Sequence, residues 1–191
     1  QWAAGDIMYK DLNGDGKISE GARTLGDHGD LKILGDTYSH YFVGIDLNAD
    51  WKGFDIRMFW QGTLKRDYFQ GSYYFWGANG RQGPWFSTAL KGHDDYFRND
   101  EASPLGTNLN SYYPRPLFNT DKNQQSQTKY LQDASYLRLK NLQIGYSLPH
   151  NIVQKMGMQH LRIFASGENL FTITSLIDFF DPESIEGGSW G

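Results

Sequence analysis

Residues 41–63 alternate between apolar and polar side chains with a period of two, and this alternation constrains the fold more than any other feature of the sequence. In a β-strand successive side chains point to opposite faces, so such a run predicts a strand with one apolar and one polar face. The pattern pauses only at Lys52 and Gly53, which predicts two antiparallel strands joined by a very short turn. One face would carry Val43, Ile45, Leu47, Trp51, Ile56, Met58 and Trp60, and the other Asp46, Asn48, Asp50, Arg57 and Gln61.

A second pair of strands is predicted within residues 130–174. From Tyr136 apolar residues occupy alternate positions, but the parity reverses at Lys140–Asn141. Such a reversal predicts a β-bulge, in which one extra residue resets the register. Pro149 should end this strand, because proline cannot donate to a strand ladder. After a short connection, a fourth alternating run begins at Leu161.

The connections between these strands differ greatly in length. The turn at Lys52–Gly53 is minimal and the connection after Pro149 is short, whereas residues 65–129 form a long polar, glycine-rich and aromatic stretch without periodicity. Loops of that length are uncommon in compact soluble domains. Short turns that alternate with long loops, between strands of about ten residues, are typical of an outer-membrane β-barrel.

Alternation alone does not separate a membrane barrel from a soluble β-sandwich, because both have one wet face and one apolar face. Only 39% of the residues are apolar although 16% are aromatic, which suits half-wet, aromatic-rich strands. No apolar run is long enough for a transmembrane helix. Aromatic residues near the expected strand ends favour the barrel, where such rings form interfacial girdles. These residues are Tyr41, Trp51, Tyr136, Tyr146 and Phe171.

Several functional classes are disfavoured. The net charge is −4, with basic and acidic residues interspersed, so no basic stripe indicates nucleic-acid binding. The chain contains no cysteine, which excludes a disulfide framework and thiolate chemistry within it. The adjacent acids Asp94–Asp95 and Asp100–Glu101 are more typical of a solvated loop than of a glycosidase pair. No catalytic triad order, P-loop or dinucleotide fingerprint occurs. We therefore expect a protein that is not an enzyme and requires no cofactor.

Four blocks of sequence carry a resemblance to a known family. The first is GDIMYKDLNGDGKI at 5–18, and the second joins GIDLN at 44–48, WKGFD at 51–55 and FWQG at 59–62. The third is YLRLKNLQIGYSLP at 136–149, and the fourth joins GENLFT at 167–172 and FDPE at 180–183. In this order they resemble the last part of the SusC/RagA-type TonB-dependent receptors of the Bacteroidetes.

The resemblance implies an all-β fold in which the chain is a carboxy-terminal part of a transmembrane antiparallel β-barrel of about 22 strands. Residues 1–38 and 65–129 would be extracellular loops, 39–64 and 130–174 hairpins, and 175–191 the start of the last loop. It further implies TonB-dependent import of glycans or peptides across the bacterial outer membrane. A SusD-like surface lipoprotein would cover the mouth, lipid would surround the wall, and TonB would act through a plug domain. The plug, the remaining strands and the final strand would lie outside this chain. The alternative is a soluble, calcium-stabilised, carbohydrate-binding β-sandwich.

The segment DLNGDGKISE at 11–20 is similar to the first ten positions of an EF-hand calcium loop. Alternate acid and amide side chains could direct oxygens to one Ca²⁺, and a glycine at the sixth position permits the sharp turn. The twelfth position, where a bidentate acid belongs, is Ala22. The alternative is a turn whose side chains cap their own backbone. The candidate calcium ligands are Asp11, Asn13, Asp15, Lys17 through its carbonyl, and Glu20.

The long segment 65–129 contains many aromatic rings beside amide and charged side chains. Rings in such a setting can stack on sugars or grip a peptide, but they can equally pack a loop onto itself or onto a partner lipoprotein. The sequence leaves both roles open. The candidate residues for substrate or partner contact are Trp76, Trp85, Tyr112 and Tyr113.

Overall fold

The computed structural model describes residues 1–81 and 83–185, which form two compact units. The sheet unit consists of residues 36–68 and 132–185, and the loop unit consists of residues 1–35 and 69–131. None of the helices in the described ranges is long and apolar enough to cross a membrane.

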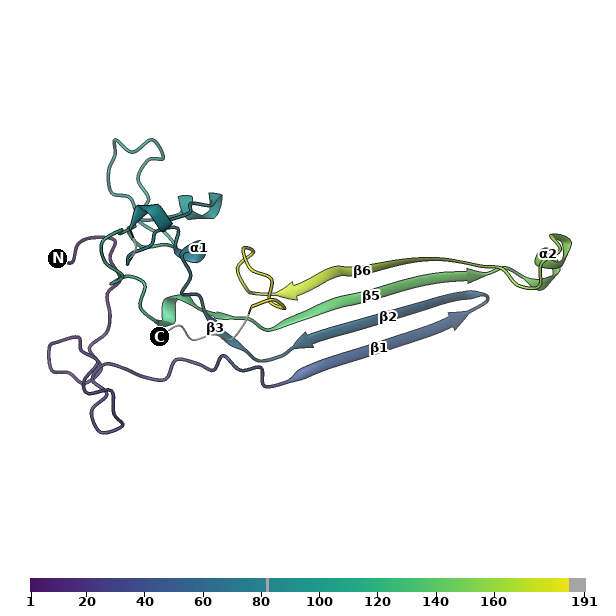
Figure 1. Ribbon diagram of the computed structural model, residues 1–191, viewed down its shortest axis with the longest axis horizontal. Coiled ribbons are helices and arrows are strands. Elements are labelled where there is room, and N and C mark those ends of the chain that lie inside the picture. The colour runs from purple at the N-terminus through teal and green to yellow at the C-terminus, as the bar shows by residue number, and fades with distance from the viewer. Residues whose placement is uncertain (82, 186–191) are drawn as a thin grey trace. The chain divides into compact units, whose positions relative to one another are not determined.

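The sheet unit is built on a four-stranded antiparallel sheet (Figure 1). Its strands lie side by side in the order β1 (Phe42–Trp51), β2 (Phe54–Thr63), β5 (Tyr136–Ser147) and β6 (Arg162–Thr174). The strands are 10 to 13 residues long. The all-β, antiparallel class predicted from the alternation is therefore confirmed. The number of strands in a complete barrel stays a prediction.

The turn between β1 and β2 is the two-residue turn that the sequence predicts. Lys52 and Gly53 have φ angles of 49° and 89°, both in the left-handed region that a type I′ hairpin turn requires. Glycine adopts this conformation without steric cost. The register that follows pairs Trp51 with Phe54 and Leu47 with Met58, so apolar residues meet apolar residues across the hairpin.

The predicted irregularity near Lys140 is also present. In the pairing of β2 with β5, Phe59 lies opposite Asn141 and Trp60 lies opposite Leu139, which leaves Lys140 without a partner in the ladder. The adjoining strand β6 is irregular at the same height, where Asn169 has a φ angle of 52°. The bulge resets the parity of β5, so that its apolar positions stay on one face along the whole strand.

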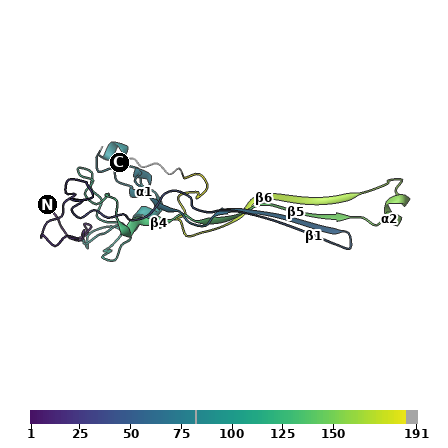
Figure 2. The same cartoon turned by 90° about the horizontal axis from the view of Figure 1, so that it is seen from below.

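The connection between β5 and β6 contains a short helix, α2 (His150–Lys155), that the sequence analysis did not predict. It lies beyond the adjoining ends of β5 and β6 (Figure 2). A helix of this length has little intrinsic stability, so tertiary contacts must hold it. Val153, which is 1% exposed, is the residue that α2 buries.

The remaining elements are short. β3 (Asp67–Phe69) and β4 (Leu131–Asp133) form a two-stranded sheet. The loop unit contains α1 (Tyr73–Trp76) and the 3₁₀ helices η1 (Pro84–Phe86), η2 (Lys91–Asp94) and η3 (Thr128–Tyr130). Its interior is mainly aromatic. Phe75, Trp76, Tyr113 and Tyr130 are buried there.

Candidate functional site

One face of the sheet is apolar and exposed. The register places Leu47, Met58, Leu142 and Gly167 in one row across all four strands. Leu47 is 47% exposed and Ile163, at the end of β6, is 62% exposed. Large apolar residues on this face that remain exposed are Ile45, Leu47, Trp51, Phe54, Ile144, Ile163, Phe171 and Ile173. A continuous apolar surface of this kind marks an interaction site or a lipid-facing surface.

The opposite face carries the charged and most of the polar residues, together with Phe42, Phe59 and Phe164. The Arg57 guanidinium on β2 donates to Asp46 on β1 over 2.9 Å. The Arg162 Nε donates to Asp55 over 2.9 Å, which ties β6 to β2 across the intervening strand, and its terminal nitrogen also reaches the Gln143 side chain on β5. The predicted segregation of the two faces is therefore confirmed.

Tyr146 and Tyr136, both expected near the ends of a strand, lie on opposite faces of the sheet. Tyr146 lies on the apolar face, where its ring centroid is 4.5 Å from that of Phe54. Tyr136 instead pairs with Thr63 on the polar face and is only 9% exposed. The parity reversal at Lys140 accounts for the difference, because residues before and after a bulge change faces.

In the segment Asp11–Glu20 the side chains cap the backbone. One carboxylate oxygen of Asp11 accepts from the Gly14 N–H over 2.6 Å, and the other accepts from the Gly16 N–H over 2.8 Å. Asp15 accepts from the Lys17 N–H over 2.8 Å, and Asn13 accepts from the Asp15 N–H over 3.0 Å. These are the contacts that the turn interpretation predicts.

The structure directs Glu20 away from this turn and brings a different acid to it. Glu20 pairs with Arg23, three residues along the chain. Asp30 accepts from the Leu12 N–H over 2.6 Å and from the Ser19 N–H over 2.7 Å, and so joins the two ends of the segment. These backbone donors hold the pKa of Asp30 below its ordinary value. Within the described ranges no group of three or more His, Cys, Asp or Glu residues is arranged to hold a metal. Calcium binding stays a prediction.

A buried carboxylate that sequence reasoning missed organises the loop unit. The Asp6 side chain is 2% exposed and accepts from Lys122 over 2.6 Å, from Arg115 over 2.9 Å and 3.0 Å, and from Asn123 over 3.0 Å. Burial by itself would raise its pKa, but these donors outweigh burial and hold the pKa far below the ordinary value. Asp6 therefore ties the first residues of the chain to the segment 115–123. Asp6 lies in the sequence block 5–18, but nothing in that block indicates its distant partners.

Three of the four predicted contact residues belong to one packed cluster. Trp76 and Tyr113 are 6% and 4% exposed, and Tyr112 is half-buried beside them. The Trp76 ring lies 4.8 Å from Tyr130, and Tyr112 lies 4.9 Å from Tyr113, both edge-on. Burial raises the pKa of both the Tyr113 and the Tyr130 hydroxyl groups. Trp76 and Tyr113 therefore pack within the loop unit, since neither presents its ring to solvent in this structure.

Trp85 has a different environment. It lies on η1 and is 89% exposed, next to the 56% exposed Phe86. The Ser87 side chain fixes this short helix, because its hydroxyl donates to the Gly83 carbonyl over 3.2 Å and accepts from the Asn79 N–H over 2.9 Å. Of the four predicted residues, Trp85 is the most exposed, whereas Tyr112 is half-buried. Its role stays a prediction.

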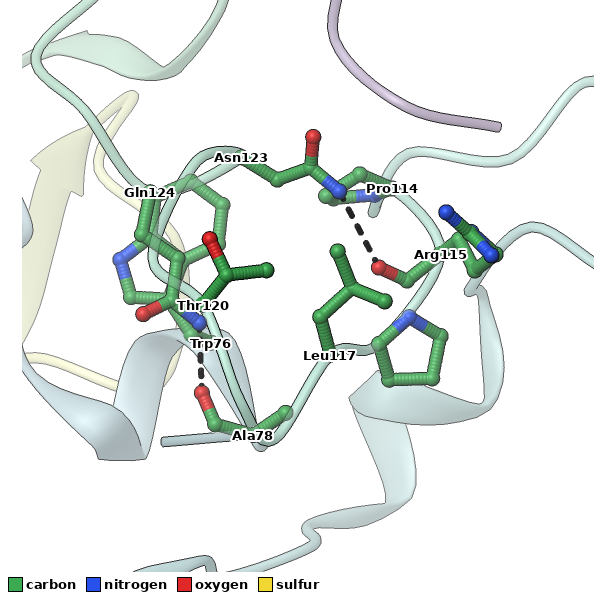
Figure 3. Close-up of a pocket in the computed structure, with 9 residues that line it drawn as sticks. Trp76, Ala78, Pro114, Arg115, Leu117, Thr120, Asn123 and Gln124 are labelled. Atoms are coloured by element: carbon green, nitrogen blue, oxygen red, sulfur yellow. Dashed lines mark hydrogen bonds between the residues drawn. The ribbon is translucent and has the colours of Figure 1, made fainter. Parts of the chain in front are cut away.

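A shallow pocket lies beside the aromatic cluster (Figure 3). Its wall is already bonded internally, because Gln124 donates to the Ala78 carbonyl over 2.6 Å and Asn123 donates to the Arg115 carbonyl over 3.3 Å. The Arg115 guanidinium is engaged by Asp6. Most polar groups of the wall are thus engaged within the protein, whereas the buried Trp76 Nε1 has no hydrogen-bond partner among the described residues.

Comparison with known proteins identifies relatives of one kind. No protein-family model matches the chain. The TonB-dependent receptor P3 of Formosa agariphila is 32% identical over 184 residues, which cover 94% of this chain and 16% of that receptor. The TonB-dependent receptor P26 of the same organism is 25% identical over 198 residues, covering 98% of this chain and 17% of that receptor. The chain thus spans about a sixth of the length of these relatives.

Solved structures agree with this result. The RagAB peptide transporter matches 73% of this chain with 27% identity and a TM-score of 0.51, over 14% of the transporter chain. The RagAB peptide importer in its closed-closed state matches 80% of this chain and 15% of that chain, with a TM-score of 0.54. Its 23% identity supports the fold alone. The chain is therefore similar to a segment of TonB-dependent receptors, which agrees with its resemblance to the SusC/RagA type.

Proposed function

We propose that the sheet unit forms part of the wall of an outer-membrane β-barrel, with its apolar face toward lipid and its polar face toward a watery lumen. The exposed apolar face carries this proposal. Apolar side chains that would be unfavourably hydrated in water contact acyl chains favourably in a bilayer. The ion pairs of Asp46 with Arg57 and of Asp55 with Arg162 would then line the lumen, where water can solvate them.

The sheet edges support the same interpretation. β1 and β6 are the outer strands of the four-stranded sheet. Within a membrane every backbone polar group needs a partner, so both edges require neighbouring strands. In a barrel, other strands of the receptor would supply them. A soluble sandwich would instead bury the apolar face beneath a second sheet, and the exposure of Leu47, Ile144 and Ile163 gives that alternative less support.

We further infer that the intact receptor imports peptides or oligosaccharides in a TonB-dependent manner, together with a SusD-like surface lipoprotein. The inference is supported by the relatives named as TonB-dependent receptors and by the likeness to a peptide transporter. TonB would act through a plug domain encoded elsewhere in the receptor. The role of this chain is then transport rather than turnover of a substrate.

Loop length supports an orientation. Outer-membrane barrels keep short turns on the periplasmic side and long loops outside. The Lys52–Gly53 turn and the α2 connection would therefore face the periplasm, and the segments 1–38 and 65–129 would lie outside the cell.

Fractionation and labelling of cells that produce the intact receptor would test this proposal. We expect the receptor to require detergent for extraction, and a membrane-impermeant maleimide to label a cysteine at Trp85 but not one at Asn151 in intact cells. Both positions should react after permeabilisation, which serves as the control. Release of the receptor by buffer alone would contradict the membrane wall. Labelling at Asn151 but not at Trp85 would reverse the orientation.

A further inference from the structure

After β6 the chain forms a loop that turns back beside the end of that strand (Figure 1). We name residues 175–185 the strap. Leu176 and Ile185, near its two ends, are buried with Ala134, and Tyr68 and Phe180 pack against them. The Arg66 guanidinium donates to the Ile185 carbonyl over 2.6 Å. Both ends of the strap are therefore fixed within the sheet unit.

Between these ends, ion pairs hold the strap to β5. The Arg138 guanidinium donates to Asp181 over 2.5 Å and 3.2 Å and to Glu183 over 2.6 Å. The Lys140 ammonium, from the bulge position, donates to both oxygens of Glu183 over 2.9 Å and 3.1 Å. Two cations of one strand thus meet two anions of the strap, and the Arg138 Nε also donates to Thr172 on β6 over 2.8 Å.

The register shows which face and which end of the sheet the strap covers. Arg138 lies opposite Gln61 on β2 and Thr172 on β6, in the polar series that also contains Arg57 and Asp55. The Arg57 side chain, nearer the Lys52–Gly53 turn, is 60% exposed, whereas the Arg138 side chain is 11% exposed. The strap therefore covers the polar face at the end remote from that turn.

We propose that Arg138 and Lys140 act as a releasable ion-pair latch that holds the strap across the lumen-facing surface of the sheet. The description of that surface as lumen-facing rests on the proposed function, whereas the latch is a property of the sheet unit itself. A latch of this composition is suited to opening. The charges of Asp181 and Glu183 remain 47% and 30% exposed, so water can solvate both partners when they separate. Apolar contacts anchor the strap at Leu176, Phe180 and Ile185, so the ion pairs control the stretch around Asp181 and Glu183.

Amide hydrogen exchange of the detergent-purified intact receptor would test the latch. Three strap amides are hydrogen-bonded near it, since Glu183 N–H donates to the Asp181 side chain, and Ser184 and Ile185 donate to the Asp181 carbonyl. We expect Arg138→Gln to accelerate exchange in 176–185 at least tenfold and to leave the β1–β2 hairpin unchanged. The matched control is Arg57→Gln, which breaks an ion pair on the same face without contact to the strap, and it should leave strap exchange unchanged.

A second variant distinguishes the loss of the ion pairs from a loss of Arg138 packing within β5. The double variant Asp181→Asn with Glu183→Gln keeps Arg138 in β5 and should release the strap equally. Unchanged strap exchange in the double variant would overturn the proposal, whatever Arg138→Gln does. Equal acceleration in the strap and throughout β5 and β6 would also overturn it. Because the exchange measurement is made in detergent, a negative result would contradict the latch and not the membrane assignment. Extraction and labelling test the membrane assignment separately.

Discussion

The substitution Leu47→Arg tests the assignment of the apolar face most directly, because the strand geometry places Leu47 near the middle of the membrane. A strand that rises about 3.3 Å per residue with a tilt of about 40° advances about 2.5 Å per residue along the membrane normal. The 10 residues of β1 then span about 23 Å, close to the apolar band of about 25 Å in such barrels. Leu47 lies about 10 Å from the Trp51 end and about 13 Å from the Phe42 end.

An arginine near the bilayer midplane on the lipid face destabilises a barrel by about 2–4 kcal/mol. We therefore expect Leu47→Arg to lower the folding equilibrium constant about 30- to 700-fold. The assay is reversible denaturant unfolding of the intact receptor in phospholipid vesicles, followed by tryptophan fluorescence. The matched control is Asn48→Arg, on the opposite face beside Arg57, where water should solvate the added charge. Equal losses in the two variants, or a larger loss in the control, would refute the assignment of the faces.

Three further predictions concern the loop unit. Asp6→Ala should destabilise the loop unit by about 1.5–3 kcal/mol, because the partly exposed Lys122 and Arg115 and the amide of Asn123 lose the buried carboxylate that accepts from them. The Asp6 contribution to stability comes from a depressed pKa, so it should be fully present above the unfolded pKa of about 4 and be lost as the pH falls below it. Urea titrations at several pH values would show this loss. Trp76→Ala should lower the free energy of unfolding of the loop unit by about 3–5 kcal/mol and speed its proteolysis. Trp85→Ala should change that free energy by less than about 0.5 kcal/mol. Equal effects of the two substitutions would contradict the burial of Trp76. If the Asp11 turn binds calcium, about millimolar Ca²⁺ should slow amide exchange in residues 11–20. Asp11→Ala should abolish this effect, and Ala22→Glu should strengthen it. Identical exchange with and without Ca²⁺ would show that the segment is a turn that does not bind calcium.

The alternation in the sequence was enough to assign the four long strands and their faces. Side-chain direction alternates strictly along any strand, so the series through Leu47 and Asp46 assigned both faces of the hairpin before any contact was known. The same rule located the bulge at Lys140, because a change of parity has few other causes. The turn at Lys52–Gly53 followed from the local need for positive φ angles. All of these are local properties.

Contacts between residues far apart in the chain follow from the folded structure and not from local pattern. Asp6 lies 109 and 116 residues from Arg115 and Lys122, and Arg138 lies 43 residues from Asp181, so no periodicity or motif links them. The aromatic rings show the same limit. Trp76 and Trp85 both lie in the aperiodic segment 65–129, each beside a phenylalanine, yet one is buried and the other exposed. Burial depends on which distant segments pack against a ring, and that packing is a property of the folded chain rather than of its neighbours in sequence.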